Sequence, residues 1–266
     1  MSSAPVGPNP VDSPGWWLPQ WDVPGVRVAC TLRTGGVSVA PYDTLNLGLH
    51  VGDDPHAVQT NRERVTQGLN TRPVWLNQVH GTQVHWLDAA TPHGLTADGG
   101  CTLERGLACT IMVADCLPVL LADAQGRAVA AAHAGWRGLA GHECRGILDH
   151  TVQTLRDHLS ESAELKAWLG PCIGPQAFEV GGEVLQAFRD NGFEPEGLSQ
   201  PHPEHEGKWW LDLAGLARQR LVQLGIRDIR GNDGDAAWCT VGDPARWFSH
   251  RRDRVSGRLA ALIWRT

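Results

Sequence analysis

Long hydrophobic runs are missing from this sequence. No apolar segment approaches the roughly 20 residues that a membrane-spanning helix needs, because Asp115 and Asp123 interrupt the most hydrophobic stretch. The N-terminus, Met-Ser-Ser-Ala-Pro-Val-Gly-Pro, lacks the basic and apolar regions of a secretory signal. The seven cysteines are odd in number and irregularly spaced, which is typical of a reducing compartment rather than of a disulfide framework. We therefore expect a cytoplasmic protein without a membrane partner.

An excess of positive charge is also absent. The chain has 23 Lys and Arg residues against 29 Asp and Glu residues, a formal net charge of -6. This balance argues against nucleic acid as a partner and against a basic helix on a membrane surface. The 266 residues are enough for one large domain or two small ones.

The order of the predicted elements indicates the fold class. Strand-like and helix-like segments interleave without strict alternation and without repeats, which favours one α/β or α+β domain with a mixed central sheet flanked by helices. Residues 1–20 are expected to form a loose N-terminal segment, and residues 21–266 the single folded domain. Asp54 and Pro55 predict a helix start, because Asp is a favoured N-cap and Pro a favoured first residue.

Two further segments carry specific expectations. One continuous helix is predicted from Gly138 to about His158. The stretch 194–208 is polar and rich in proline, so we expect it to be an excursion on the surface.

A central hairpin gives the first hint of chemistry. Two apolar strands, residues 117–122 and 128–132, flank a tight turn around residues 124–126. A two-residue loop at the start of this turn places Cys116 directly opposite His133. A loop centred one position later places them diagonally on the same face, and a three-residue loop places them on opposite faces. The loop length therefore decides whether the two side chains meet.

A third residue, His80, ends another predicted strand just before a glycine. One Cys and two His are suitable zinc ligands, and three protein ligands leave the fourth position to water or substrate. Two other interpretations remain open at this point. Cys116 can be the nucleophile of a Cys–His hydrolase with His133 as its base, or it can simply pack in a buried hairpin.

Three arginines are candidates for binding an anionic group of the substrate. Arg33 precedes a glycine turn, Arg137 lies at the entry to a predicted helix, and Arg251 belongs to an Arg-Arg-Asp sequence near the C-terminus. A planar guanidinium binds phosphate or carboxylate through two hydrogen bonds.

A set of short motifs follows in order along the chain. They are Asn-Gln-Val-His-Gly at 77–81, Ala-Asp-Gly at 97–99, Ala-Asp-Cys-Leu-Pro-Val at 114–119, His-Ala-Gly-Trp-Arg-Gly at 133–138, Gly-Pro-Cys-Ile-Gly-Pro at 170–175, Phe-Glu-Val at 178–180, Phe-Ser-His-Arg-Arg-Asp at 248–253 and Gly-Arg at 257–258. Taken together, these motifs resemble the YfiH-like family, also called polyphenol oxidase or multicopper laccase-like and later purine nucleoside phosphorylase. The resemblance covers residues from about Val26 to Trp264.

The resemblance implies a site and a set of reactions. His80, Cys116 and His133 are the implied metal ligands and catalytic residues, with zinc as the metal. The implied fold is a single α/β domain grouped with certain bacterial toxin cysteine hydrolases. The implied activities are phosphorolysis of adenosine, inosine, guanosine and S-methyl-5'-thioadenosine, and deamination of adenosine. The partners are then a nucleoside and phosphate, with no obligate protein partner.

Two alternatives accompany this assignment. Relatives are also described as editing hydrolases for peptidoglycan precursors, which would use the same three residues. The older label of a copper-dependent polyphenol oxidase is disfavoured, because a multicopper oxidase needs a further cluster of histidines and this chain has no His-X-His pair.

Overall fold

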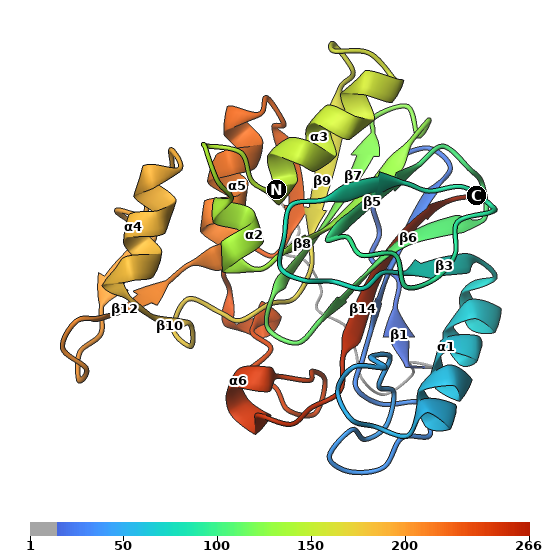
Figure 1. The fold of residues 1–266 in the computed structure, drawn as a ribbon, viewed down its shortest axis with the longest axis horizontal. Helices are drawn as coiled ribbons and strands as arrows, with labels where there is room; N and C mark the ends of the chain where they lie inside the picture. The colour runs from blue at the N-terminus through green and yellow to red at the C-terminus, as the bar shows by residue number, and fades with distance from the viewer. Residues whose placement is uncertain (1–14) are drawn as a thin grey trace.

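The structure is a computed structural model that describes residues 15–266. Two large sheets form its centre (Figure 1). The first sheet has the strand order β1-β2-β14-β6-β3, and the second has the order β13-β9-β7-β8-β5-β4. The strands of the first sheet are β1 (Trp16–Trp17), β2 (Val26–Thr31), β14 (Leu259–Arg265), β6 (Leu107–Val113) and β3 (Arg72–Trp75). Those of the second are β13 (Asp228–Gly231), β9 (Leu165–Leu169), β7 (Leu117–Asp123), β8 (Val129–Ala134), β5 (Gly99–Thr102) and β4 (Val84–Trp86).

Six α-helices and a 3₁₀ turn occur within residues 15–266. They are α1 (Pro55–Leu69), α2 (Trp136–Ala140), α3 (Ile147–His158), α4 (Gly182–Asp190), α5 (Leu213–Gln223), α6 (His250–Asp253) and the turn η1 (Ala236–Trp238). Asp54 caps α1 as predicted, because its side chain accepts the backbone N–H of His56. None of these helices combines the length and apolar character needed to cross a bilayer.

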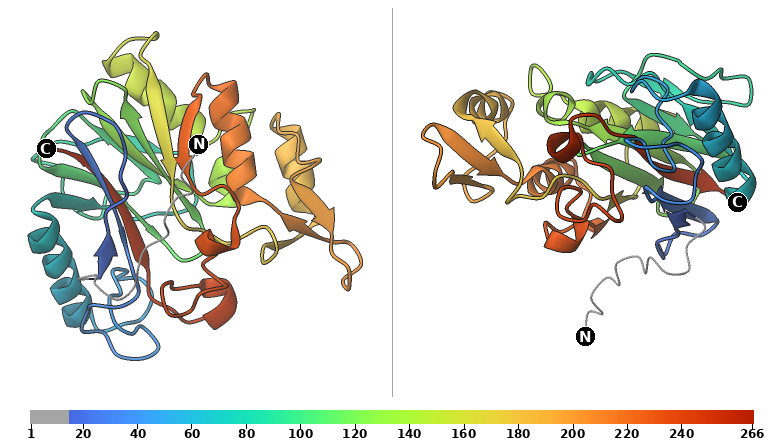
Figure 2. Two further views of the ribbon diagram at one scale, coloured as in Figure 1. Left: turned by 180° about the vertical axis from the view of Figure 1, so that it is seen from behind. Right: turned by 90° about the horizontal axis from the view of Figure 1, so that it is seen from below.

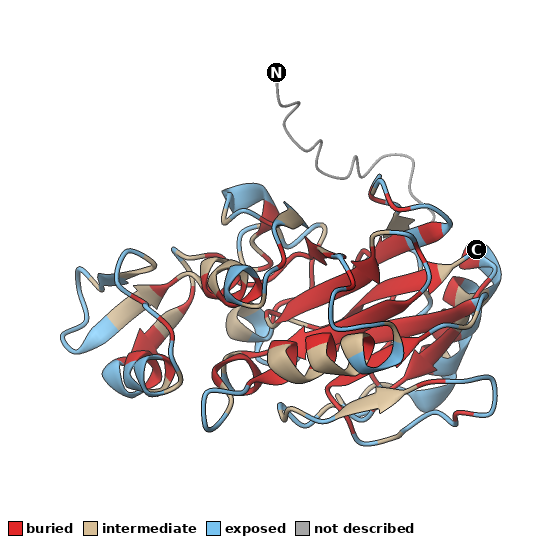
Figure 3. Cartoon of the chain, turned by 90° about the horizontal axis from the view of Figure 1, so that it is seen from above, coloured by how far each residue is buried: buried red, intermediate tan, exposed pale blue. Residues whose placement is uncertain are grey.

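The layers follow from the alternation of side chains along the strands. In β7, Leu117, Val119 and Leu121 pack against helices α3 and α5. The intervening Leu120 and Ala122 face the other sheet and pack with its strands β6 and β14. A third cluster joins the outer face of that sheet to α1. The buried strands of both sheets lie between the helices in Figure 3.

The predicted class, mixed α/β, is confirmed, since both sheets combine parallel and antiparallel pairs. The predicted single central sheet is instead two sheets packed face to face. Their strands are buried on both faces. A continuous apolar run in the sequence predicts such burial, but it does not show whether a helix or a second sheet covers the strand.

The N-terminal boundary differs from the expected one. Residues 1–14 of the predicted loose segment lie outside the described residues. Within the described part, Trp16 and Trp17 form β1 and pair with Thr31 and Cys30 of β2. The fold therefore includes residues before position 21.

The helix predicted from Gly138 to His158 is wrong, because two helices, α2 and α3, replace it. Gly141 ends α2 with a φ of +70°, and a Cβ atom there would lie 2.1 Å from the carbonyl oxygen of Arg145. Glu143 and Cys144 also have positive φ values, so the chain turns before α3 begins.

The predicted surface excursion at 194–208 contains regular structure. A three-stranded ribbon is formed by β10 (Glu179–Gly181), β12 (Lys208–Leu211) and β11 (Ser199–Pro201), in the order β10-β12-β11. This ribbon and α4 project from one side of the molecule (Figure 2).

Candidate metal centre

The hairpin of β7 and β8 brings Cys116 and His133 to one face. Pro118 pairs with His133 and Leu117 with Ala134, so Cys116, one residue further, lies diagonally from His133. The N–H of Asp123 donates to the carbonyl of Ala128 at 3.0 Å and closes a four-residue turn. The arrangement is thus the diagonal one among those that the sequence left open, with both side chains on the same face.

His80 joins this pair from the loop after β3. The Sγ atom of Cys116 lies 3.7 Å from Nε2 of His80. One potential ligand atom from each of His80, Cys116 and His133 lies within 4.8 Å of the others. His133 is buried, Cys116 half-buried and His80 exposed, so the cluster is closed on one side and open on the other. Such an arrangement suits a metal that keeps a position for an exogenous ligand.

Gly135 leaves the space in which these three side chains converge. A Cβ atom on Gly135 would lie 3.0 Å from Cδ2 of His80, 3.2 Å from Sγ of Cys116 and 3.7 Å from Cε1 of His133. Gly135 also precedes the first residue of α2 with an ordinary φ of -65°, so backbone freedom does not explain its presence. Close approach to the ligand side chains explains it instead.

We expect Gly135→Ala to weaken metal binding about tenfold, because the new methyl displaces the ligand side chains by a few tenths of an ångström and a shift of about 1 Å can cost about 100-fold. Competition for zinc with a chromophoric chelator measures the affinity. Gly182→Ala is the matched control, since a Cβ atom at this position of α4 meets nothing within 4 Å. An unchanged affinity in Gly135→Ala, with an unchanged melting temperature, would contradict the role assigned to this glycine.

The fully buried Asp98 holds two members of the cluster in position through hydrogen bonds. One carboxylate oxygen lies 2.8 Å from Nδ1 of His133 and accepts the backbone N–H of His80 at 2.9 Å. The other accepts the N–H groups of Val79 and Gly81 at 3.2 and 2.7 Å. A carboxylate on Nδ1 fixes the tautomer and ring orientation of His133 and leaves Nε2 free for a metal.

Sequence reasoning assigned no role at the site to Asp98. The residue stands in one of the motifs of the resemblance, directly before the strand β5 that pairs with β8. Its carbonyl also accepts the backbone N–H of His133 at 2.7 Å, so strand pairing places it beside that histidine. The pairing of β5 with β8 was not predicted, and this explains why the residue was missed.

Charges within the cluster favour a thiolate. Burial alone would raise the pKa of Cys116, but the charge and hydrogen bond of His133 and the hydrogen bond of His80 outweigh it and lower the pKa to about 6. For His133, burial lowers the pKa, whereas Cys116 and Asp98 raise it to about 9. Without a metal the two side chains therefore form a thiolate–imidazolium pair at neutral pH. The thiolate is also the form of cysteine that binds metals.

Two residues of the cluster region have strained backbone conformations. His80 has a φ of +61° and Asp115, the neighbour of Cys116, a φ of +90°. Specific contacts hold both residues in place. Asp98 binds the amides around His80, while the carboxylate of Asp115 accepts the Thr240 hydroxyl and the Arg251 backbone N–H, each at 2.6 Å. Asp115 thereby ties the Cys116 turn to the start of α6.

A cavity of about 460 Å³ opens over the cluster. It is large enough for a small organic molecule. Its apolar and aromatic lining is formed by Met112, Val113, Ala114, Trp136, Ile173, Phe178 and Leu213. Its cationic and imidazole lining, apart from the ligands, is formed by His50, Arg137, His250, Arg251, Arg254 and Arg258.

The three arginines predicted from the sequence have different positions. Arg137 and Arg251 line the cavity. Arg33 is not among the lining residues. Its guanidinium donates to the carbonyls of Asp43 and Pro244 and forms an ion pair with the Asp43 carboxylate at 3.3 Å. These contacts join two loops and leave Arg33 away from the cluster.

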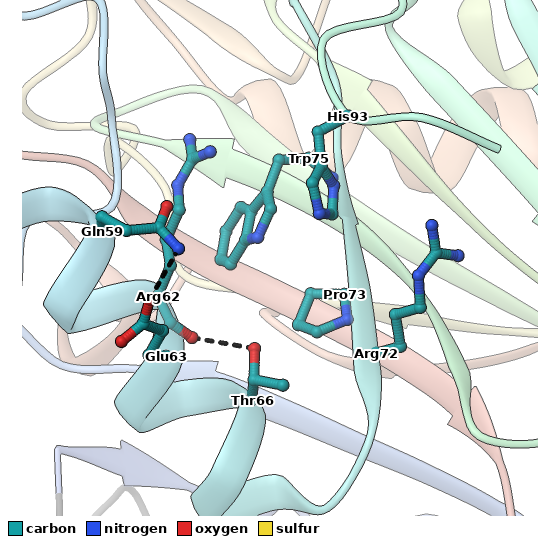
Figure 4. Close-up of a pocket in the computed structure, with 8 residues that line it drawn as sticks. All are labelled: Gln59, Arg62, Glu63, Thr66, Arg72, Pro73, Trp75 and His93. Carbon is teal, nitrogen blue, oxygen red and sulfur yellow. Dashed lines mark hydrogen bonds between the residues drawn. The ribbon is translucent and has the colours of Figure 1, made fainter. Parts of the chain in front are cut away.

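A smaller pocket of about 130 Å³ lies between α1 and β3 (Figure 4). It shares no lining residue with the larger cavity. Arg62 stacks on Trp75 at its edge and donates two hydrogen bonds, of 2.9 and 2.8 Å, to the carbonyl of Leu47. These bonds anchor the loop that carries His50 to the wall of the larger cavity.

Sequence comparison identifies the family. The sequence model of the family described as "Multi-copper polyphenol oxidoreductase laccase" matches residues 27–266. The chain belongs to this family. The resemblance to the YfiH-like family is thus confirmed, because proteins named YfiH are among its relatives.

Curated relatives of this polyphenol oxidoreductase family match nearly the full chain. "Purine nucleoside phosphorylase PA4543" of Pseudomonas aeruginosa is 47% identical over 250 residues, covering 94% of this chain and 98% of that protein. "Purine nucleoside phosphorylase YfiH" of Escherichia coli is 44% identical over 250 residues, covering 93% and 97%. The crystal structure of Neisseria meningitidis protein NMB0706 is similar with a TM-score of 0.85, at 41% identity and with coverage of 94% and 99%.

The donor types bear on which metal could bind this cluster. Imidazole nitrogen and thiolate sulfur are both donors that zinc accepts, and a catalytic zinc keeps one position open. A blue-copper centre has two His and one Cys as well, but adds a weak axial ligand, and a multicopper oxidase adds a separate histidine cluster. The second His-containing group of the described residues, Glu179, His202 and His205, lies on the β10-β12-β11 ribbon.

Proposed function

We propose that this protein is a zinc-dependent purine nucleoside phosphorylase that holds its metal with His80, Cys116 and His133. The observation that carries the proposal is the cluster of three potential ligands. It opens into a cavity whose lining contains arginines as well as aromatic side chains. The printed names of the relatives from Pseudomonas aeruginosa and Escherichia coli support the same reaction class.

The cavity provides contacts for both parts of a nucleoside reaction. Trp136 and Phe178 contribute aromatic rings to the lining, and we propose that the purine packs against them. Arg137 and Arg251 are proposed to contact the substrate, since they line the cavity and carry fixed positive charge. Arg33 has no place in this proposal, because it does not line the cavity.

A bound zinc ion would act as a Lewis acid and would lower the pKa of a water ligand to about 7. The chain's own residues prepare this site: His133 is oriented by Asp98, and Cys116 is held as a thiolate. We propose adenosine, inosine, guanosine and S-methyl-5'-thioadenosine as substrates of phosphorolysis. Hydrolytic deamination of adenosine, in which water replaces the amino group at C6 and ammonia leaves, is proposed as a second activity of the same site.

The test combines elemental analysis with product analysis. We expect about one zinc per chain, and release of ribose 1-phosphate from inosine only when phosphate is present. Removing the metal with a chelator should abolish both activities, and added zinc should restore them. Full activity of the metal-free protein would overturn the zinc assignment. Hydrolysis of a muropeptide without any reaction of nucleosides would favour the peptidoglycan-editing alternative.

A further inference from the structure

The arginines that line the cavity differ in how their guanidinium groups are engaged. Arg251 donates to the carbonyl oxygens of Ala177 and Glu179, including two bonds of 3.2 Å to Glu179. Arg137 is exposed and lies over the ring of Trp136, with 4.4 Å between the guanidinium carbon and the ring centroid. Neither side chain presents a buried, unpaired guanidinium to the cavity.

Arg258 is half-buried, and part of its guanidinium is left without a partner in the described part of the chain. Its backbone N–H donates to Oδ1 of Asn46 at 2.8 Å, and its methylenes pack where a Cβ atom on Gly48 would otherwise lie, 2.7 Å from Cγ. Nη1 donates to the carbonyls of Ser256 and Gly257 at 3.0 and 3.1 Å. Within residues 15–266, Nε and Nη2 of this half-buried group have no hydrogen-bond partner.

Arg258 also lacks a carboxylate partner among the described residues. Asp115 is the acidic residue whose charge acts on it, but both oxygens of Asp115 are bound to Thr240 and to the N–H of Arg251. Arg258 lines the same cavity as the three candidate metal ligands, and the charge of the Cys116 thiolate acts on it as well. A partly buried cation without a carboxylate in direct ion-pair contact is stabilised further when a ligand supplies negative charge.

His50 lies on the same wall. His50 lies in the same loop as Asn46 and Gly48, which contact Arg258. Both His50 and Arg258 line the cavity. No hydrogen bond engages the His50 ring among the described residues. Partial burial and the charges of Arg258 and Arg62 lower the pKa of His50, so its ring is neutral at physiological pH and can donate and accept. In the part of the chain that the structure describes, the wall therefore offers the two unpaired guanidinium nitrogens of Arg258 and the unpaired, neutral imidazole of His50.

We propose that Arg258, together with His50, binds the inorganic phosphate consumed by the phosphorolysis, an inference that rests on the proposed function. In that reaction a phosphate oxygen forms the bond to C1' of the ribose while the bond from C1' to N9 of the purine breaks. The electron pair of that bond stays on N9, which takes a proton from solvent. Two unpaired guanidinium N–H groups match two phosphate oxygens, and the position beside the ligand cluster places phosphate next to the reacting nucleoside.

The experiment titrates sodium phosphate into the zinc-loaded enzyme by calorimetry and measures KM for phosphate with inosine as substrate. We expect Arg258→Gln to weaken phosphate binding and to raise KM for phosphate at least about tenfold, with a much smaller change in KM for inosine. Arg258→Lys, which keeps the charge but loses the planar donor pair, should recover part of the binding. Arg230→Gln, at an exposed residue of β13 outside the cavity, is the matched control for the loss of one arginine.

The outcomes separate this inference from the proposed function. Equal phosphate binding by the wild type and Arg258→Gln, with both folded as judged by their melting temperatures, overturns it, and so does a wild type that binds no phosphate. If the wild type binds phosphate and Arg258→Gln does not, the inference stands. Where no nucleoside is cleaved, the assignment of Arg258 to phosphate binding still stands and the proposed function alone fails.

Discussion

Cys116→Ala is expected to lower nucleoside phosphorolysis about a thousandfold or more and to leave the purified protein largely free of zinc, because a bound metal stabilises developing charge by several kcal/mol. The substitution removes the only thiolate of the cluster and leaves His80 and His133 to hold a metal alone. Elemental analysis and a ribose 1-phosphate assay measure the two effects on the same preparation.

The control for this substitution is Cys144→Ala. Cys144 is also a free thiol, but it is exposed in the turn between α2 and α3 and does not line the cavity. It should retain wild-type zinc and activity. Cys116→Ser separates ligation from nucleophilic attack: serine is a poor zinc ligand, so zinc content and activity should fall together. Loss of activity with full retention of zinc would instead make Cys116 the nucleophile of a Cys–His hydrolase.

The hairpin illustrates how far sequence reasoning reaches. The period of two along a strand placed Cys116 and His133 on one face for two of the three loop lengths considered. The choice between those loops depends on a contact that local pattern does not show. At Gly126 the φ is +71°, and a Cβ atom would lie 1.9 Å from the carbonyl oxygen of Pro24, so a distant segment fixes the turn.

The rest of the site depends on contacts between segments far apart in the chain. His80 was joined to the pair through its donor chemistry and then through the family resemblance, and the structure brings it within reach by way of the loop after β3. Arg33 was predicted as a substrate contact because a glycine turn follows it. Arg258, which was not predicted, lines the cavity, and its backbone N–H is bound by Asn46, a residue 212 positions away in the sequence. Local motifs identify residue types well but do not identify such partners.

The second sheet has the same explanation. Strand β7 was predicted as an apolar strand, β6 is apolar as well, and both are buried throughout. They belong to different sheets, although only the turn at residues 114–116 separates them. Strand neighbours are usually adjacent in one sheet, so a single sheet was the natural expectation. The turn with Asp115 at positive φ redirects the chain from one layer to the other, and Cys116 lies at this crossing.

Asp98→Asn is expected to lower both zinc affinity and activity about 10- to 100-fold, because the partner of a metal-binding histidine fixes its tautomer and orientation. The carboxylate accepts four hydrogen bonds, from His133 and from the backbone of Val79, His80 and Gly81. An asparagine retains one acceptor oxygen and turns an NH₂ group toward the remaining donors. The loop that carries His80 and the ring of His133 are then both released from their positions.

If Asp98 only stabilised the fold, its substitution would not change the pKa of Cys116. The pH at which Cys116 becomes a thiolate therefore distinguishes a positioning role from a structural one. Asp98 raises the pKa of His133, and the resulting imidazolium lowers the pKa of Cys116 to about 6. In metal-free Asp98→Asn the imidazolium is less stable, so the alkylation rate of Cys116 by iodoacetamide should rise at a higher pH than in the metal-free wild type. Asp123→Asn is the control: Asp123 is equally buried and pairs with Arg127, but it lies outside the cavity. If both variants melt earlier and neither shifts the alkylation profile, Asp98 stabilises the fold without positioning His133.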